Sequence, residues 1–399
     1  DNGVWAHGFV GRAGRPVTKV ASAPTLVAAP EPDDIVRWDF VRTLPATSTA
    51  AQDRDALVLP VRRGLLVLAA GDPERSRCRV RIEQRSVYAS RASGLRSSRS
   101  GGARGDNSLQ VTTSVPNLSF VEATGDDRVD LVTHAEAFVA VHPGTDDGCF
   151  ARRATRRQLL TMRTPEELRR GQGFVSSEVR DVDGDGLADL LLTKVSGGLT
   201  DLATVLRIHR GQSGGGFSAS PIQTFESSGF GASVHFGDVD GDGALEMVQP
   251  RAEISIVALT RILLSSSMTV DIDVRRRSKR TDQVFEPSPA QTLQTTVGLD
   301  FSRPYGVLGS LPVFEHDFDG DGLPDILLSK GKDEMGLHRG RRGSALFEGD
   351  ARLGLDGPGS FFTGVLMPGG DARPELVVWF PGRDELDQTL HIYRMNLER

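Results

Sequence analysis

Asp181-Val-Asp-Gly-Asp-Gly-Leu-Ala-Asp189 is the stretch of this chain that decides its fold, because two close copies of it follow. The copies are Asp238-Val-Asp-Gly-Asp-Gly-Ala-Leu-Glu246 and Asp317-Phe-Asp-Gly-Asp-Gly-Leu-Pro-Asp325. Each has carboxylates at positions 1, 3, 5 and 9, and glycines at positions 4 and 6 allow the sharp turn that brings the carboxylates together. Oxygen donors without His or Cys suit Ca²⁺, whereas zinc prefers nitrogen or sulfur. The repeat therefore predicts three calcium-binding loops.

Each loop is predicted to supply four carboxylates and the backbone carbonyl at position 7 to its ion. We therefore expect about three structural Ca²⁺ ions. Because the carboxylates of each tight cluster repel one another without a cation, we also expect the stability of the fold to depend on calcium. The predicted ligands are Asp181, Asp183, Asp185, Leu187 and Asp189 in the first loop, Asp238, Asp240, Asp242, Ala244 and Glu246 in the second, and Asp317, Asp319, Asp321, Leu323 and Asp325 in the third.

The residues that follow the loops exclude an EF-hand. That motif needs a bidentate Glu at position 12 and a helix on each side, but position 12 holds Leu192, Gln249 and Leu328. Each loop instead leads into a short apolar run, such as Leu190-Leu-Leu-Thr193, which has the length of a buried strand. The sequence therefore predicts a repeating unit of strand, calcium loop and strand.

Phe230-Gly231, followed by Gly237-Asp-Val-Asp-Gly-Asp-Gly243, resembles the FG-GAP or VCBS repeat. This family includes the β-propeller head of integrin α subunits and many bacterial surface proteins. Residues 210–217 resemble the hairpin that lies further along the family's repeating unit. The resemblance implies an all-β fold, but it leaves the binding partner open, because the family includes adhesins, lectins and polysaccharide lyases on one scaffold.

Degenerate copies extend the repeat beyond the three strong loops. Glu122, Asp126 and Asp130 are candidate ligands of a weaker metal site at 122–130, and fainter copies lie at 367–375 and 52–59. The last positions of the six copies are separated by about 50 to about 80 residues, and strand-rich units of roughly this period favour a β-propeller. We predict six four-stranded blades, or seven if the N-terminal stretch or the segment at about 250–312 contains another.

We expect residues 1–399 to form a single domain, because a closed radial array of blades counts as one, with a long hairpin insertion at about 250–312. The strand Thr389-Leu-His-Ile-Tyr393 is expected to pair with an N-terminal strand such as Ile35-Val-Arg-Trp38, which would close the ring and remove exposed sheet edges. A content of 45 Gly and 21 Pro fits many short strands and tight turns. No apolar run reaches the roughly 18 residues that span a bilayer.

The chain has two cysteines, Cys78 and Cys149. An even number in an exported chain predicts one disulfide that joins the first and second repeats, and two buried free thiols are the alternative. Calcium loops are typical of compartments in which calcium is plentiful. We therefore expect an extracellular, cell-surface or periplasmic location.

Two surface motifs have a functional and a simpler interpretation. Arg104, Gly105 and Asp106 lie in a Gly- and Ser-rich stretch that would expose an integrin-recognition tripeptide, and a chance occurrence is the alternative. The basic segments 152–157 and 275–280 are interpreted as solvated surface, and an anionic partner is the alternative. A formal charge of −6 and the lack of a nucleic-acid-binding signature argue against nucleic acid.

The function expected from this scaffold is an adhesion or protein–protein interaction platform that binds a protein or a glycan at the cell surface, alone or as one subunit of a larger assembly. The sequence lacks Gly-x-Ser-x-Gly and His-Glu-x-x-His signatures, so we predict no enzymatic activity and no catalytic residues. The alternative is a lectin or a calcium-dependent polysaccharide lyase. His235 and His316, which precede the second and third loops, are the bases that a lyase would use.

Overall fold

The structure is a computed structural model, and it shows an all-β chain. One short helix interrupts the strands in the part of the chain that the structure describes. The residues described are 3–6, 18–22, 42–44, 56–61, 64–69, 72–83, 85–91, 108–114, 116–136, 138–198, 201–231, 234–252, 265–299, 307–308, 313–330, 334–354, 362–366, 374–379 and 391–394.

Most strands belong to six antiparallel sheets, numbered here in chain order. Sheet 1 contains β3 (Arg42–Leu44), β4 (Ala56–Val61), β5 (Gly64–Ala69) and β6 (Asp72–Val80). Sheet 2 contains β9 (Asn117–Val121), β10 (Asp130–Ala135), β11 (Phe138–His142) and β12 (Arg156–Leu159). Sheet 3 contains β13 (Phe174–Arg180), β14 (Asp189–Ser196), β15 (Ala203–His209) and β18 (Gln223–Ser228).

Sheet 4 contains β19 (Phe230–Gly231), β20 (His235–Gly237), β21 (Glu246–Ala252), β22 (Ser267–Arg275), β23 (Gln291–Leu299) and β24 (Val307–Leu308). Sheet 5 contains β25 (Val313–His316), β26 (Asp325–Ser329), β27 (Glu334–Gly340) and β28 (Phe347–Gly354). Sheet 6 contains β29 (Phe362–Leu366), β30 (Glu375–Trp379) and β31 (His391–Arg394). Three smaller pairs are β1 (Gly3–Ala6) with β2 (Thr18–Ser22), β7 (Arg85–Arg91) with β8 (Ser108–Ser114), and β16 (Gly211–Gln212) with β17 (Gly216–Phe217).

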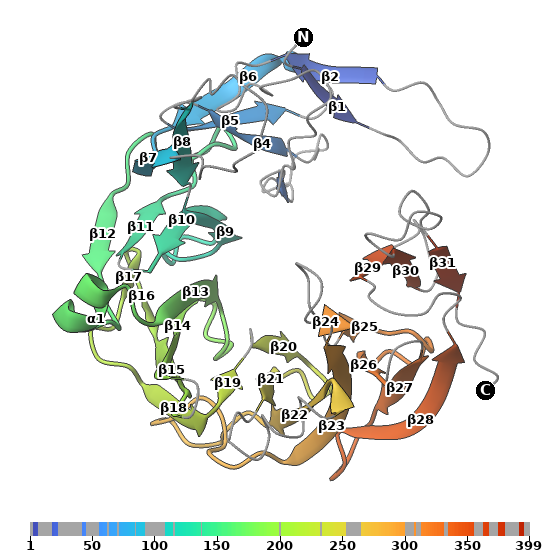
Figure 1. Ribbon diagram of the computed structural model, residues 1–399. Coiled ribbons are helices and arrows are strands. Elements are labelled where there is room, and N and C mark those ends of the chain that lie inside the picture. Colours follow the sequence, from blue (N-terminus) through green and yellow to red (C-terminus); the bar gives the residue numbers. More distant parts are fainter. Residues whose placement is uncertain are drawn as a thin grey trace, which may run out of the picture.

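Within each sheet the strands are hydrogen-bonded in the order in which they occur along the chain, except that β19 and β20 of sheet 4 both pair with β21. The sheets also follow one another in chain order along a curved path, from sheet 1 through sheets 3 and 4 to sheet 6 (Figure 1). Contacts between strands of successive sheets include those of β10 with β13 and of β20 with β25. Each of sheets 1 to 5 is therefore a local unit that packs against its neighbour along the chain.

The strand that follows the acidic loop in each of sheets 2 to 5 is largely buried. Five consecutive residues at the start of β14, and all five residues of β26, are buried. By contrast, β18 alternates between half-buried and exposed residues, which is the pattern of an outer strand with one face in solvent. The apolar runs that follow the acidic loops thus form the interior strands, as the sequence predicts.

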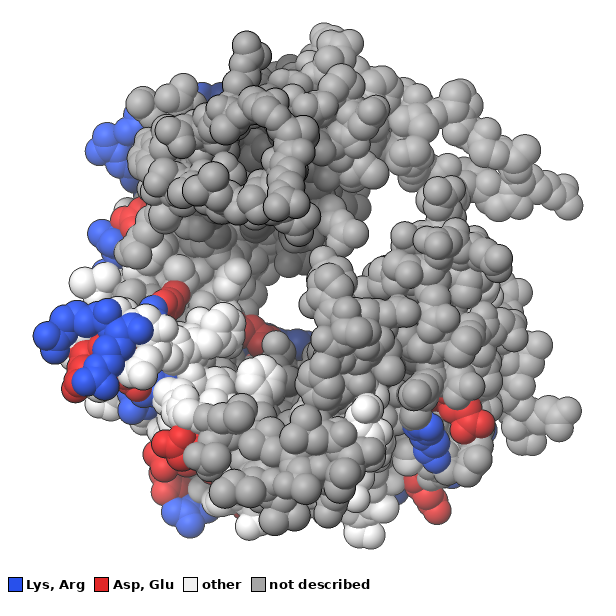
Figure 2. Space-filling model, viewed as in Figure 1, with Lys and Arg blue, Asp and Glu red and all other residues white. Residues whose placement is uncertain are grey.

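The helix α1 (Pro165–Arg170) connects sheets 2 and 3. Thr164 caps it, because its hydroxyl accepts from the backbone N–H of Glu167 at 3.2 Å while the Glu167 carboxylate accepts from the Thr164 N–H at 2.7 Å. Glu167 also accepts from Lys194 Nζ at 3.1 Å, which docks the helix on β14. Basic side chains gather at the edge of the molecule where α1 lies (Figure 2).

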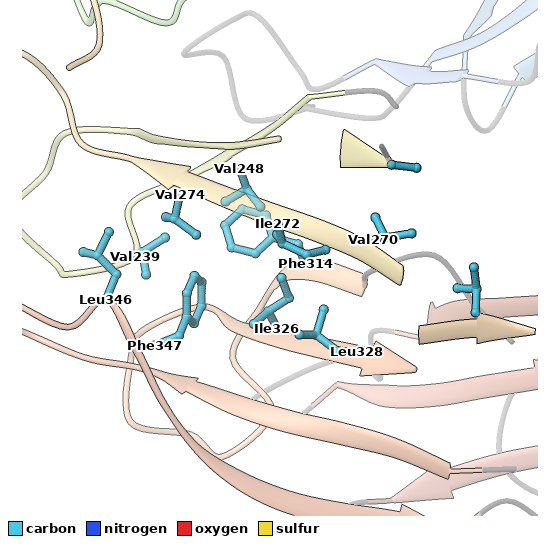
Figure 3. Close-up of a cluster of buried hydrophobic side chains, with 12 residues drawn as sticks. Val239, Val248, Val270, Ile272, Val274, Phe314, Ile326, Leu328, Leu346 and Phe347 are labelled. Atoms are coloured by element: carbon cyan, nitrogen blue, oxygen red, sulfur yellow. The ribbon is translucent and has the colours of Figure 1, made fainter. Parts of the chain in front are cut away.

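Hydrophobic cores lie between successive sheets. One of them joins sheets 4 and 5, with Val248 and Ile272 on one side and Ile326 and Phe347 on the other (Figure 3). Similar clusters join sheets 2 and 3 and sheets 3 and 4. The apolar residues of one sheet are therefore buried by the next sheet along the chain.

Glutamine side chains bracket the junctions between sheets, a feature that the sequence did not predict. Gln223 of β18 donates from Nε2 to the carbonyl of Phe285 at 2.7 Å and accepts at Oε1 from the N–H groups of Val284 and Phe285, both at 2.9 Å. Gln291 of β23 makes the same three contacts with Leu346 and Phe347. In each case a glutamine of one sheet forms three hydrogen bonds with the backbone of the next sheet, and we call this arrangement a glutamine bracket.

A third bracket joins sheets 2 and 3. Gln158 of β12 donates to the Phe217 carbonyl at 2.7 Å and accepts from its N–H at 3.1 Å. The gripped Phe has the same place in each sheet, since Phe217, Phe285 and Phe347 form antiparallel bridges with Gly211, Arg277 and Gly340. The brackets are therefore a repeated element of the fold.

Replacing a bracket glutamine is expected to destabilise the fold. Gln223→Ala leaves the backbone groups of Val284 and Phe285, both fully or almost fully buried, without their partners, and this costs about 3 kcal/mol in the free energy of unfolding. Urea unfolding of the variant measures the loss. Gln294→Ala is the matched control, because Gln294 is itself exposed, donates to a half-buried Asp271 carboxylate, and its loss costs at most about 0.5 kcal/mol. Equal losses in the two variants would contradict a role for the bracket.

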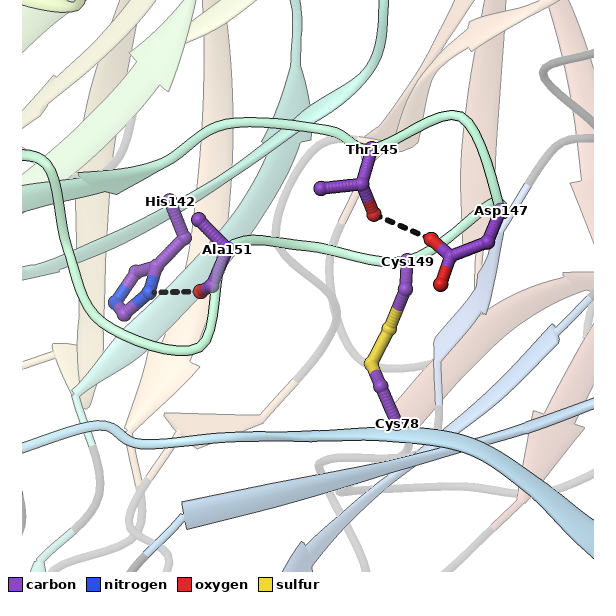
Figure 4. Close-up of a disulfide and its surroundings, with 6 residues drawn as sticks. All are labelled: Cys78, His142, Thr145, Asp147, Cys149 and Ala151. Atoms are coloured by element: carbon purple, nitrogen blue, oxygen red, sulfur yellow. Dashed lines mark hydrogen bonds between the residues drawn. A yellow bond between two sulfur atoms is a disulfide. The ribbon is translucent and has the colours of Figure 1, made fainter.

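A disulfide takes the place of a bracket between sheets 1 and 2, which confirms the predicted pairing. Cys78 lies on β6 and is bonded to Cys149 (Figure 4). Cys149 directly precedes Phe150, which is bridged to Gly144 as the bracketed phenylalanines are bridged in later sheets. The Cα atoms of the two cysteines are 6.3 Å apart. Cys149 packs in the core between these sheets with Val80.

Several sequence predictions fall at the limits of the described chain. Residues 104–106, the candidate recognition loop, lie outside the described residues, as do 52–55, 35–38 and most of 367–375. The strand β31, which was expected to pair with an N-terminal strand, pairs with β30 in the part of the chain that the structure describes. Strands β22 and β23, within the segment predicted as a hairpin insertion, pair with each other and continue sheet 4.

Candidate metal centres

The three strong acidic loops connect β13 to β14 in sheet 3, β20 to β21 in sheet 4 and β25 to β26 in sheet 5. In every loop the glycines at positions 4 and 6 have positive φ, for example 66° at Gly184 and 88° at Gly186. A side chain would be strained in this left-handed conformation. The glycine spacing therefore produces the predicted turn.

Each turn brings three carboxylates to one point. One oxygen from each of positions 1, 3 and 9 lies within 4.8 Å of the other two, in a group that can hold a metal ion. The groups are Asp181, Asp183 and Asp189; Asp238, Asp240 and Glu246; and Asp317, Asp319 and Asp325.

The position 1 carboxylate organises the turn itself. Asp317 accepts at Oδ1 from the N–H of Gly320 at 2.6 Å and at Oδ2 from the N–H of Gly322 at 2.8 Å. Asp181 makes the same two contacts with Gly184 and Gly186, at 2.7 and 3.0 Å. The position 1 carboxylate thus holds the loop backbone in place. Its oxygens keep further lone pairs that can bind a metal ion together with the other two carboxylates.

The position 9 carboxylate anchors the loop to the interior strand. Asp189, 1% exposed, accepts from the N–H groups of Val182 at 3.2 Å and Gly211 at 2.8 Å. Burial raises the pKa of Asp189 to about 7, that of Glu246 to about 7 and that of Asp325 to about 6. Their neighbouring aspartates act in the same direction, so a cation is the partner that would favour the ionised carboxylates.

Positions 5 and 7 contact each other in all three loops. Asp185 accepts at Oδ1 from the N–H of Leu187 at 2.9 Å, and the pairs Asp242 with Ala244 and Asp321 with Leu323 have the same arrangement. The position 5 carboxylates are not members of the groups that meet within 4.8 Å. The structure thus places these predicted ligands beside the group and does not bring them into it.

The burial and hydrogen bonding of Asp240 indicate whether a metal ion fits the second loop. Its residue is 8% exposed, and its Oδ1 atom is buried without a hydrogen-bond partner among the described atoms. An unpartnered buried carboxylate oxygen is costly, and coordination of a cation would satisfy it. The donors are all oxygen, so the group fits a hard cation such as Ca²⁺.

An arginine binds the other oxygen of the position 3 aspartate in each loop. Arg210 Nε lies 2.7 Å from Asp183 Oδ2, Arg339 Nε lies 3.4 Å from Asp319 Oδ2, and Arg276 pairs with Asp240 Oδ2. The sequence analysis missed these arginines. The sequence pattern that could have revealed two of them is the tripeptide His-Arg-Gly, which occurs at 209–211 and again at 338–340.

The first three residues of the basic segment 275–280 make contacts with carboxylates, an aromatic ring and backbone carbonyls. The interpretation of the segment as solvated surface is therefore wrong for these three residues. Arg275 is 9% exposed, and its guanidinium contacts Asp273 at 3.3 Å and lies over the ring of Phe225. Arg277 donates from one nitrogen to the Val182 carbonyl at 2.9 Å and from another to the Asp183 carbonyl. The segment therefore ties sheet 4 to the acidic loop of sheet 3.

The degenerate loop at 122–130 has a related but different geometry. Glu122, Asp126 and Asp130 bring one oxygen each within 4.8 Å of the others, so position 5 replaces position 3, which is Thr124. Glu122 Oε1 accepts from the N–H groups of Thr124 and Gly125 at 2.8 and 2.6 Å. Its Oε2 is buried without a hydrogen-bond partner among the described atoms.

Acidic loops of successive sheets touch one another. The N–H of Ala188 donates to the carbonyl of Glu122 at 2.8 Å, and that of Gly214 donates to the carbonyl of Thr124 at 2.8 Å. These bonds join the loop of sheet 2 to sheet 3, and Arg277 joins the loop of sheet 3 to sheet 4. The acidic loops of sheets 2 and 3 are therefore bonded directly to each other, and the loop of sheet 3 is bonded to sheet 4.

Residues 169–248 match the sequence profile of the FG-GAP-like repeat. The chain carries an FG-GAP-like repeat. The matched FG-GAP segment contains the first two strong loops together with Phe230-Gly231. It confirms the family resemblance of the sequence, and FG-GAP repeats are associated with interaction domains that resemble β-propellers.

Solved structures that are similar to this chain include two of low sequence identity. A chain of the Photorhabdus luminescens Tc holotoxin pore is similar over 89% of this chain, at 14% identity and a TM-score of 0.38, and the likeness spans 14% of that chain. The uncharacterized protein lmo1340 from Listeria monocytogenes EGD-e is similar over 90% of this chain and 95% of its own, at 10% identity and a TM-score of 0.26. The comparison with curated proteins finds no match.

Proposed function

We propose that this chain is a calcium-stabilised extracellular β-propeller that acts as an adhesion or protein–protein interaction platform. Sheets 1 to 6 would be its six blades. Sequential antiparallel strands within each sheet, and packing of each sheet on the next, support this architecture.

The observation that carries the calcium assignment is the carboxylate group of the second loop, with its buried and unpaired Asp240 Oδ1. Asp238, Asp240 and Glu246 would hold the ion, and their counterparts would do so in the other two loops. Bound Ca²⁺ would supply two positive charges at the point where the carboxylates meet. Its role is structural, since the same residues fix the loop backbone and anchor the interior strand.

The extracellular location is supported by the disulfide between Cys78 and Cys149, because such bonds persist in oxidising compartments. A membrane-crossing helix is not found among the described residues. The role as a platform is supported by the bond from Ala188 to Glu122, which joins the acidic loops of sheets 2 and 3 and makes this part of the surface rigid enough to present to a partner.

The proposal is tested with beads that carry the purified chain and are applied to cell monolayers. We expect adhesion in millimolar Ca²⁺, loss of adhesion in EGTA, and loss after protease treatment of the cells. Loss after glycosidase treatment instead would favour a lectin, and no adhesion would contradict the platform. In parallel, release of ultraviolet-absorbing unsaturated uronides from acidic polysaccharides would reveal a lyase.

A further inference from the structure

The arginines that bind the acidic loops occupy one equivalent position in the repeat. The first residue after each loop is paired across the sheet with a residue of the third strand: Leu190 with His209, Met247 with Arg275, and Ile326 with His338. The residues that directly follow these three partners in the sequence are Arg210, Arg276 and Arg339. Three separate strands therefore deliver a guanidinium to the same oxygen of the position 3 aspartate.

The loop of sheet 2 provides an internal comparison. There Leu131 pairs with His142, so the equivalent position is Pro143, and position 3 of the loop is Thr124. Among the four acidic groups that the structure describes, the arginine is thus present where position 3 is an aspartate and absent where it is not. This pattern indicates that the arginine serves the aspartate.

Burial makes the pairing electrostatically significant. The side chains of Asp183, Asp240 and Asp319 are 3%, 7% and 12% exposed, and those of their arginines are 31% to 39% exposed. A carboxylate this deeply buried beside two other carboxylates is costly unless a positive charge lies nearby, because it loses its hydration and is repelled by its neighbours. The guanidinium provides that charge from the solvent side of the loop.

We propose that Arg210, Arg276 and Arg339 are built-in counter-ions of the acidic loops. Each neutralises the position 3 carboxylate so that the loop keeps its shape before calcium binds, and each weakens calcium binding, because a fixed positive charge repels a second cation nearby. The proposal deepens the proposed function and rests on its calcium assignment. It implies weaker calcium binding than the same loop would have without its arginine.

The test measures calcium binding by isothermal titration, and melting temperature in EGTA, on the full-length chain. For Arg276→Gln we expect one site to bind Ca²⁺ about tenfold more tightly, while the melting temperature in EGTA falls by a few degrees. Arg276→Lys keeps the charge and is expected to bind Ca²⁺ nearly as the unchanged protein does. Arg280→Gln is the matched control, because Arg280 is exposed and pairs with Asp282 away from the loops.

The outcomes separate this inference from the proposed function. If the unchanged chain binds Ca²⁺ but Arg276→Gln binds it equally or more weakly, the counter-ion role is wrong and the calcium assignment stands. If the unchanged chain binds no Ca²⁺, both are wrong. Arg210→Gln repeats the test at a more exposed arginine, so that poor folding of one variant does not decide the result.

Discussion

Removal of calcium is expected to lower the melting temperature of this chain by about 10 °C. A ligand that binds only the folded state stabilises it by about 2.7 kcal/mol at one hundred times its dissociation constant, so three ions contribute about 8 kcal/mol. For a chain of 399 residues this corresponds to the stated shift, because the entropy of unfolding scales with length. The measurement is thermal unfolding in millimolar Ca²⁺ and in EGTA.

Single substitutions assign this effect to the loops. Asp240→Asn removes the charge from the carboxylate with the unpaired oxygen, and it is expected to abolish roughly a third of the calcium-dependent rise. Asp282→Asn makes the same chemical change at an exposed aspartate and is expected to leave the rise intact. A melting temperature that is independent of calcium, or an equal loss in both variants, would show that the loops are not calcium sites.

Loss of the disulfide is expected to have the second largest effect. The bond closes a sequence separation of 71 residues, for which the chain-entropy relation gives a stabilisation of about 4 kcal/mol. The double variant Cys78→Ala with Cys149→Ala should therefore unfold at a lower urea concentration. The loss of stability should be concentrated at the contact between sheets 1 and 2, because Cys149 lies in their shared core.

Reductant supplies the control for this experiment. It should destabilise the unchanged chain to the level of the double variant and leave the variant itself unaffected. Titration of two free thiols in the denatured, unreduced protein would contradict the disulfide. Insensitivity of the unchanged chain to reductant would show that the bond contributes little to stability.

The sequence predicted the acidic groups and the interior strands well, because both depend on local rules. Spacing in Asp317-Phe-Asp-Gly-Asp-Gly-Leu-Pro-Asp325 determines the turn, and the apolar run after it determines the buried strand. The pairing of Cys78 with Cys149 was predictable because the chain has two cysteines. The six-bladed ring and the calcium ions remain predictions.

The contacts between repeats were not predictable in the same way. Gln223 and Arg277 are polar residues in polar segments, and their partners Phe285 and Val182 are far away along the chain. Their roles depend on how one sheet is placed against the next, which no local pattern encodes. Only after the register is known does the equivalence of Arg210, Arg276 and Arg339 become apparent.

The glutamine brackets have a consequence for how such a chain can grow. Gln158, Gln223 and Gln291 grip main-chain atoms, which are the same whatever the sequence of the neighbour. A duplicated repeat would therefore find the same bracket contacts at both of its ends, and only the apolar side chains between the sheets would have to match. Gene duplication, or a deliberate transplant of sheet 3 into a relative, can thus lengthen the array one module at a time.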